Sequence, residues 1–326
     1  MKEIAFRDAI RDAMSEEMRR DERVLLMGEE VAEYNGAYKA SQGMLDEFGP
    51  ERVIDTPIAE LGFAGIGVGA AVNGLRPIVE FMTFNFSLVA IDQIINSAAK
   101  MLSMSGGQYS VPMVFRGPTG NAGQLGAQHS QNFENWYANT PGLKVVVPSN
   151  PYDAKGLLKS SIRDNDPVIF MESELMYGDK MVIPDEEYLI PIGKADIKKP
   201  GKDVTIVSFG KMVPRVVMPA VQELAKQGIE AEVVDLRTVR PIDYDTVIQS
   251  IKKTNRCVIV EEAWPLASIS SELAYWIQRY AFDFMDAPVL RVTNRDVPLP
   301  YAPTLIEEIL PNVKRTIDAV NTVMYR

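Results

Sequence analysis

The chain has 326 residues, of which 46% are hydrophobic, and its 34 basic and 44 acidic residues give a formal net charge of −10. Such a length can bury a sizeable core and suggests two domains. The acidic balance argues against a protein that grips phosphate backbones, so nucleic acid is not an expected partner. The single cysteine, Cys257, excludes an intrachain disulfide framework and a Cys-rich zinc site, and it fits a reducing compartment.

The first 24 residues are predicted to form an amphipathic helix that carries acids as well as bases, unlike a signal or transit peptide. No stretch approaches the roughly 18 apolar residues of a membrane span. We therefore expect a cytoplasmic protein with no membrane contact, and the alternative is an organellar protein whose leader has been removed.

Short β-branched segments alternate with helical segments along almost the whole chain, which is typical of an α/β fold. In the first half the predicted strands are 24–28, 52–55, 76–81, 112–117, 144–148 and 167–172, and the predicted helices are 60–73, 88–103 and 151–163. In the second half the predicted strands are 204–210, 231–236, 257–262 and 288–293, and the predicted helices are 213–227, 244–252 and 267–281.

A polar segment, 172–203, is punctuated by proline and glycine and has only weak periodicity, so the best linker candidate lies within it. We expect one domain at 1–185, a linker at 186–203 and a second domain at 204–326. The second domain is expected to have no carboxylate or histidine cluster past its strands, and hence to pack against partners rather than perform chemistry.

Ligand groups in open parallel sheets collect just past the carboxyl ends of strands. Five predicted strand ends carry unusual residues, at 28–39, 55–65, 80–86, 116–131 and 172–178. Their convergence predicts a binding site.

Glu60 lies in "DTPIAELGFAG", a segment that is otherwise mostly apolar, small or turn-forming. With Thr56 as N-cap and Pro57 as the first helical residue, Glu60 falls one position beyond the capping-box partner. The following helix has almost no polar face and is expected to be buried. A buried carboxyl is either paired with another group or protonated, and both states suit proton transfer. The equal alternative is that Glu60 is a solvated glutamate in the first turn of the helix, where it interacts with the helix dipole.

A nicotinamide site is the rival interpretation, because Gly65, Gly67 and Ala70 spell G-x-G-x-x-A. That fingerprint needs a strand that runs directly into the first glycine. Here the glycines are expected inside a helix, where small residues allow close packing.

His129 is the only histidine, and it lies in "GPTGNAGQLGAQHSQ", whose glycines, amides and hydroxyls are typical of an ordered ligand loop. A satisfied structural histidine is the alternative. The sequence has no G-x-S-x-G elbow, so a serine hydrolase is not expected.

Five long segments together resemble one family, the beta subunits of the thiamine-diphosphate-dependent decarboxylating component of 2-oxo acid dehydrogenase complexes. These segments are 55–100, 112–131, 141–178, 230–243 and 293–306. The pyruvate dehydrogenase members are the most similar. The resemblance implies two three-layer α/β domains, a transketolase-type pyrimidine-binding domain followed by a transketolase-type C-terminal domain.

The resemblance also implies roles for single residues. Glu60 matches a glutamate that hydrogen-bonds the cofactor's aminopyrimidine ring, and Phe86 matches an aromatic residue packed against that ring, with core packing as its alternative. His129 matches a histidine that handles the substrate-derived intermediate and its transfer to the lipoyl group. Glu29, beside Glu30, matches an acidic patch between paired active sites.

The chain contains no GDG motif, which in this class of enzymes holds the diphosphate through Mg²⁺. The resemblance therefore implies a separate alpha subunit that carries Mg²⁺, an α2β2 heterotetramer, and docking to a dihydrolipoyl acetyltransferase core. It also implies a potassium site formed mainly by main-chain carbonyls. The matching positions are Met113, Ser161, Asp164 and Asp166.

The implied reaction is the oxidative decarboxylation of pyruvate, with transfer of the acetyl group to a lipoyl group and acetyl-CoA as the product of the full complex. Acetoin and branched-chain 2-oxo acids are alternative substrates. A non-catalytic scaffold subunit and an NAD-binding oxidoreductase are the alternatives from other classes.

Overall fold

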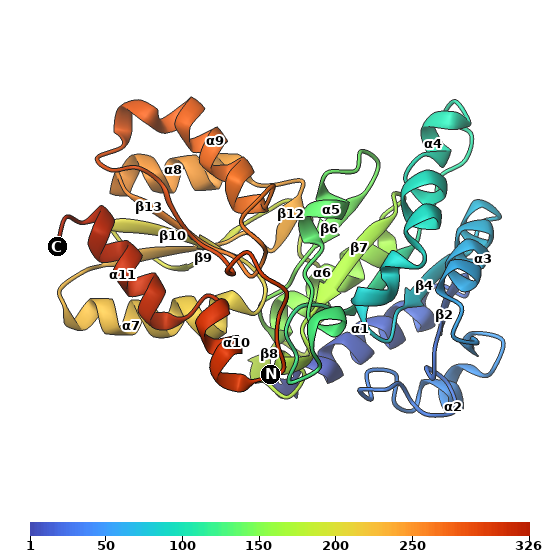
Figure 1. Cartoon of the computed structure of the whole chain (residues 1–326). Helices are drawn as coiled ribbons and strands as arrows, with labels where there is room; N and C mark the ends of the chain where they lie inside the picture. Colours follow the sequence, from blue (N-terminus) through green and yellow to red (C-terminus); the bar gives the residue numbers. More distant parts are fainter. The chain divides into compact units, whose positions relative to one another are not determined.

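The computed structural model describes residues 1–326, which form two compact units (Figure 1). The first unit comprises 1–119 and 136–192, and the second comprises 120–135 and 193–326. Segment 120–135, which carries His129, therefore groups with the C-terminal half of the chain. The expected linker at 186–203 contains the boundary between the units and also a strand, β9 (Asp196–Lys199).

The first unit is built around a parallel sheet whose strands run in the order β6-β7-β5-β4-β2-β3, with a separate antiparallel pair, β1 and β8. Its strands are β1 (Lys2–Ala5), β2 (Val24–Gly28), β3 (Val53–Asp55), β4 (Arg76–Glu80), β5 (Val114–Pro118), β6 (Lys144–Val146), β7 (Val168–Glu172) and β8 (Lys180–Ile183). Its helices are α1 (Phe6–Arg20), α2 (Met44–Phe48), α3 (Glu60–Val72), η1 (Phe84–Leu88), η2 (Gln93–Ala98), α4 (Met101–Met104), α6 (Pro151–Arg163) and η4 (Glu174–Met176). The short helix α5 (Glu134–Ala138) spans the boundary between the units.

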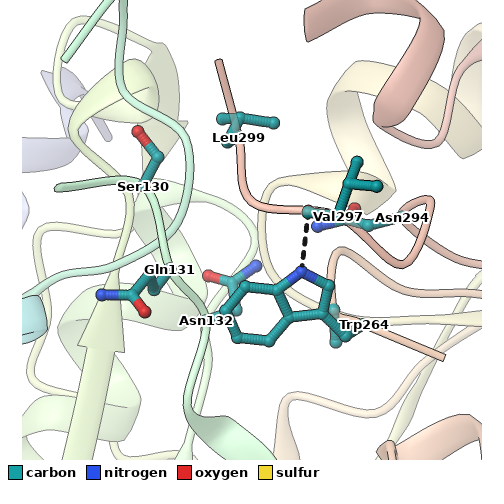
Figure 2. Close-up of a pocket in the computed structure, with 8 residues that line it drawn as sticks. Ser130, Gln131, Asn132, Trp264, Asn294, Val297 and Leu299 are labelled. Atoms are coloured by element: carbon teal, nitrogen blue, oxygen red, sulfur yellow. Dashed lines mark hydrogen bonds between the residues drawn. The ribbon is translucent and has the colours of Figure 1, made fainter. Parts of the chain in front are cut away.

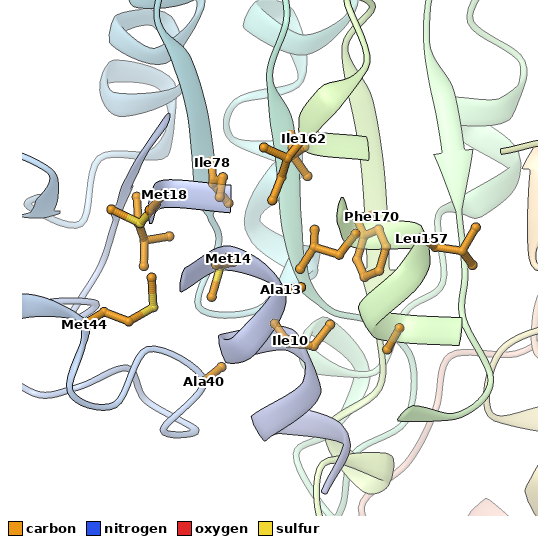
Figure 3. Packing of buried hydrophobic residues seen from close by; sticks show 14 of the residues in the cluster. Ile10, Ala13, Met14, Met18, Ala40, Met44, Ile78, Leu157, Ile162 and Phe170 are labelled. Carbon is orange, nitrogen blue, oxygen red and sulfur yellow. The ribbon is translucent and has the colours of Figure 1, made fainter. Parts of the chain in front are cut away.

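Helices α1 and α6 pack together on one face of this sheet, and α3 packs on the other face against β4. Ile10 and Met14 of α1, Leu157 of α6 and Phe170 of β7 belong to one buried cluster, and Figure 3 shows Phe170 between α1 and Leu157. Ile10 and Met14 recur at helical spacing, so one stripe of α1 is apolar and enters the core. Burial of this stripe against the sheet holds the helix in place.

The helix predicted at 151–163 is confirmed at the same limits, because Asn150 caps it through a bond from Asp153 N, 2.9 Å long, and Pro151 occupies its first position. The helix predicted at 60–73 is also confirmed. The helix predicted at 88–103 is wrong in its continuity, since it divides into the π-helical turn η2 and the short α4.

The second unit has a sheet in the order β14-β13-β10-β11-β9, parallel except for β9. Helices α7 and α11 cover one face and α8 and α9 cover the other (Figure 1). Its strands are β9, β10 (Val204–Ser208), β11 (Ala231–Asp235), β12 (Thr238–Arg240), β13 (Cys257–Val260) and β14 (Leu290–Val292). Its helices are η3 (Ala127–His129), η5 (Val213–Val217), α7 (Met218–Lys226), α8 (Tyr244–Thr254), α9 (Ile269–Ala281), η6 (Phe282–Phe284), α10 (Pro303–Ile309) and α11 (Val313–Val323).

The predicted pair of three-layer α/β domains is thus confirmed. None of the helices combines the length and the apolar character that crossing a bilayer requires.

Candidate active site

Glu60 is the first residue of α3, and Ala59 is the N-cap. The predicted helix start, with Thr56 as N-cap and Pro57 as the first helical residue, is wrong, because the chain stays extended there and Thr56 N donates to Gly28 O over 2.9 Å. Glu60 is only 7% exposed. Its carboxyl therefore lies at the positive end of the helix dipole while being shielded from water.

Helix α3 is buried on one face only. Phe63 and Val68 are buried, whereas Ile66 is 65% exposed, so the expectation of a fully buried helix is wrong for this chain. At Gly67 a Cβ atom would lie 2.7 Å from Val79 Cγ2 and 3.1 Å from Met113 Cε. Glycine there lets the helix approach the sheet closely.

The position of the glycines in α3 argues against the nicotinamide interpretation. Gly65 and Gly67 lie within α3 rather than in a turn that joins a strand to a helix. Their main-chain N–H groups are therefore not presented to a pyrophosphate in the manner of the dinucleotide fingerprint. The prediction that the glycines fall inside a helix is confirmed.

Glu29 lies directly after β2, and its buried carboxyl is close enough to Glu60 for the charge of Glu60 to act on it. The Oε1 atom of Glu29 is buried without a hydrogen-bond partner. Burial, followed by the charge of Glu60, raises the pKa of Glu29 to about 7. Glu29 is therefore partly protonated near neutral pH, and one of its oxygens remains available to a ligand.

Beside this pair lies a buried ionic cluster that sequence reasoning missed. Arg116, in β5, binds Glu80 at the end of β4 and forms two bonds of 2.6 Å to Glu172 at the end of β7. Tyr177 donates to Glu172 Oε2 over 2.8 Å. All four side chains are buried, and burial raises the pKa of Glu80 against the opposing effect of Arg116. The parallel register opposes Glu80 and Arg116 on neighbouring strands, a relation that becomes visible once the strand order is known.

Phe86 lies in η1 and is only partly buried. Its neighbours Phe81 and Phe84 are fully buried, and their rings pack edge to face with centroids 5.4 Å apart. Phe86 therefore keeps part of its side chain exposed beside the buried rings of Phe81 and Phe84.

His129 ends the single turn η3 and is partly buried in the second unit. A small pocket adjoins its segment (Figure 2), and Trp264 Nε1 donates to Val297 O over 3.0 Å at its wall. The pocket is lined by Ser130, Gln131, Asn132, Ala263, Trp264, Asn294, Val297 and Leu299. Ser130 Oγ and Asn294 Oδ1 are buried without hydrogen-bond partners, so a water molecule or a polar ligand group could bind there.

The expectation that the C-terminal domain lacks carboxylates past its strands is wrong. Glu261 and Glu262 follow β13 directly, Lys211 follows β10, and all three are buried. Glu134 is buried in the same unit, and burial, strengthened by the charges of Glu261 and Glu262, raises its pKa to about 8. The sequence alone does not reveal that Lys211 pairs with Glu262, because the two residues lie 51 positions apart.

The main-chain oxygens of Met113, Ser161 and Asp164, three of the four expected potassium ligands, already accept hydrogen bonds. Met113 O accepts from Val168 N over 3.0 Å, and Asp164 O accepts from Arg76 Nη1 over 2.9 Å. Lys144 binds the carboxylate of Asp164 at 2.7 Å and that of Asp166 at 3.0 Å. Side-chain cations therefore already neutralise the carboxylates beyond the end of α6.

No group of three or more histidine, cysteine, aspartate and glutamate side chains is arranged to hold a metal ion. A thiamine pyrimidine does fit the features of the first unit. The buried carboxyl pair supplies a donor and an acceptor, including the unpartnered Oε1 of Glu29, and Phe86 supplies an aromatic face.

Known families match both units. Residues 2–180 match the transketolase pyrimidine-binding domain, and residues 193–316 match the transketolase C-terminal domain. A solved structure described as a split gene transketolase, an inactive beta4 tetramer, is similar in fold with a TM-score of 0.80 at 22% identity, covering 99% of this chain and 98% of that one.

Curated relatives match along the full length. The chain is 57% identical to the pyruvate dehydrogenase E1 component subunit beta of Rhizobium meliloti, over 100% of this chain and 71% of the relative. It is 53% identical to the mitochondrial subunit beta of Dictyostelium discoideum, over 100% and 92% of the two chains. It is also 53% identical to the subunit beta of Rickettsia felis, over 99% of both.

Proposed function

Because this chain belongs to the family of pyruvate dehydrogenase E1 beta subunits, we propose that it supplies the pyrimidine-side half of a thiamine-diphosphate site that an alpha subunit completes. The alpha subunit would carry Mg²⁺ and the diphosphate contacts, since this chain has no GDG motif. The assembly would be an α2β2 heterotetramer that acts on pyruvate.

The observation that carries this proposal is the buried pair of Glu29 and Glu60. Burial and the charge of Glu60 raise the pKa of Glu29 to about 7, which makes a proton available beside Glu60 at neutral pH. Glu60 would bind the pyrimidine ring nitrogen, and Phe86 would pack against the ring face. Bound thiamine diphosphate supplies the electron sink for decarboxylation.

His129 would take part in the second half of the reaction, the transfer of the acetyl group to a lipoyl group. An imidazole can exchange a proton near neutral pH, which suits attack by a thiol or departure of one. The second unit would also contribute to contacts with the alpha subunit and with a dihydrolipoyl acetyltransferase core.

The test uses the chain co-purified with an alpha subunit. Glu60→Gln should retain the α2β2 assembly in size-exclusion chromatography while ferricyanide-coupled turnover of pyruvate falls by about 100-fold or more, since a positioned acid–base group contributes roughly 10²–10⁴-fold. Activity near that of the wild type would contradict the proposal and favour a scaffold role.

Substrate choice is tested in the same assembly by comparing pyruvate, 2-oxobutyrate, acetoin and 2-oxoisovalerate. We expect pyruvate to have the highest kcat/KM. A preference for 2-oxoisovalerate or acetoin would contradict the assignment of pyruvate as the substrate. It would leave the proposed role in binding thiamine diphosphate unchanged. Full turnover by the purified chain alone would contradict the need for an alpha subunit.

We also propose a potassium site at the main-chain oxygens of Met113, Ser161, Asp164 and Asp166. What supports it is the position of Ser161, Asp164 and Asp166 at the C-terminal end of α6, where carbonyl oxygens carry partial negative charge, while Met113 directly precedes β5. The ion would use lone pairs that the bonds from Arg76 and Val168 leave free. Replacing potassium by tetramethylammonium should lower the melting temperature, and an unchanged melting temperature would contradict the site.

A further inference from the structure

The segment that carries His129 is a loop closed at its base. Gly120 N donates to Gln131 O over 2.9 Å, which joins the two arms of the loop. Several side chains between these residues, including Leu125 and Gln128, are exposed. The position of His129 therefore depends on what fixes the base and the tip of this loop.

The base is bound by a buried ion pair from the second unit. Glu262 Oε1 accepts from Asn121 N over 2.7 Å, and Lys211 Nζ donates to Asn121 O over 2.5 Å. Lys211 Nζ and Glu262 Oε2 lie 2.8 Å apart. The N–H and C=O groups of one loop residue are thus bound by opposite members of a single ion pair.

The other arm of the loop is bound by the same glutamate. Asn132 Nδ2 donates to the main-chain oxygen of Glu262. Gly120 has a φ of +76°, and a Cβ there would lie 2.8 Å from Glu262 Oε1 and 3.0 Å from Lys211 Nζ. Only glycine fits this close approach, so the base of the loop is shaped around the ion pair.

The tip of the loop rests on the C-terminal part of the chain. Gly126, with a φ of +78°, lies so close to the ring of Tyr301 that a Cβ would collide with it. Turn η3 begins at the next residue and ends at His129. In the chain, His129 therefore lies between a contact at Gly126 and the base of the loop at Gln131 and Asn132, which the ion pair binds.

We infer that the ion pair of Lys211 and Glu262 is a positioning element for His129, so that the C-terminal unit sets the geometry of acyl transfer in addition to any role in assembly. The inference rests on the proposed function of His129. It does not require either residue to touch substrate, because both act through the main chain of Asn121 and the side chain of Asn132.

The test compares two rates in the assembled α2β2 enzyme: ferricyanide-coupled decarboxylation and acetylation of a lipoyl domain. Lys211→Met should slow lipoyl acetylation about tenfold or more while slowing decarboxylation much less, since misplacement by roughly 1 Å can cost 10²-fold. Hydrogen exchange should become faster in residues 120–132.

A double-mutant cycle separates positioning from general weakening. If Lys211 acts through His129, the variant His129→Ala/Lys211→Met should be no slower in lipoyl acetylation than His129→Ala. Lys253→Met is the matched control, because it also removes the cationic partner of a buried carboxylate, Glu232, in the same unit. It should leave the ratio of the two rates unchanged.

If Lys211→Met does not assemble, the same comparison is made with Lys211→Met/Glu262→Gln. This double variant leaves no buried charge unpaired, and the glutamine oxygen can still accept a hydrogen bond from Asn121 N. An unchanged ratio of the two rates, or additive effects with His129→Ala, would overturn the inference and leave the cofactor role of Glu60 intact. Wild-type turnover by Glu60→Gln would instead overturn the proposed function.

Discussion

The buried carboxyl group of Glu29 lies close enough to Glu60 for the charge of Glu60 to act on it, although the two residues follow different strands and lie 31 positions apart. Glu29 comes directly after β2, whereas Glu60 follows an extended segment after β3. The parallel pairing of β2 with β3 brings both strand ends to one edge of the sheet. Two carboxyls in contact in a buried place favour the retention of one proton.

Glu29→Gln should therefore change the pH dependence of turnover. In the wild type, Glu29 gains a negative charge beside Glu60 as the pH rises through about 7, and this charge changes the electrostatic field at the cofactor-binding carboxyl. The glutamine variant is neutral throughout, so the inflection near pH 7 in kcat/KM for pyruvate should disappear. Glu33→Gln, an exposed change in the same loop, should keep the inflection. An inflection that survives in Glu29→Gln would contradict the assignment.

The packing of α3 predicts opposite effects for two glycines of one helix. Gly67→Ala should lower stability by about 1–3 kcal/mol, because its Cβ would press on Val79 and Met113. Gly69→Ala meets nothing within 4 Å and should raise the stability of the isolated chain by roughly 0.5–1 kcal/mol through helix propensity. Thermal unfolding of both variants measures the difference, and equal melting temperatures would contradict this packing.

Glu134 should make stability fall with rising pH. Its pKa is raised from about 4.5 to about 8 in the folded state, so the folded protein binds a proton that the unfolded chain releases. The stabilisation is complete below about pH 4.5 and is lost as the pH rises through about 8. Glu134→Gln should therefore stabilise the protein relative to the wild type at pH 9.

The measurement for Glu134 is denaturant unfolding at pH 6, 7.5 and 9. The exposed Glu308→Gln serves as the control and should follow the wild-type curve. A Glu134→Gln variant with the same pH dependence as the wild type would show that Glu134 titrates normally in the folded protein.

A chain that ends at residue 195 should lose both partner binding and the order of segment 120–135. The truncation removes Lys211, Glu262 and Tyr301, which contact that segment. Limited proteolysis should cut within 120–135, and analytical ultracentrifugation should show no α2β2 assembly and no binding to the acyltransferase core. Stable assembly of the truncated chain would remove the partner-binding role assigned to residues 204–326.

Much of the fold could be predicted because local patterns carry it. β-branched runs predicted the central strands of both sheets, and Asn150 with Pro151 marked the start of α6. Other elements were missed for physical reasons. Strand β8 is mostly exposed and lies in a polar segment, and α10 and α11 begin after the last predicted strand, where no helix was predicted.

For the site, the sequence by itself singled out Glu60 and His129, because an isolated carboxyl before an apolar helix and a lone histidine in a glycine-rich loop are visible without coordinates. Only the tertiary structure decided that Glu29 is buried beside Glu60 with a raised pKa and that segment 120–135 belongs with the C-terminal unit. The reason is physical. A pKa depends on burial and on charges brought close by strand order, and the anchoring of a loop depends on groups far away in the sequence.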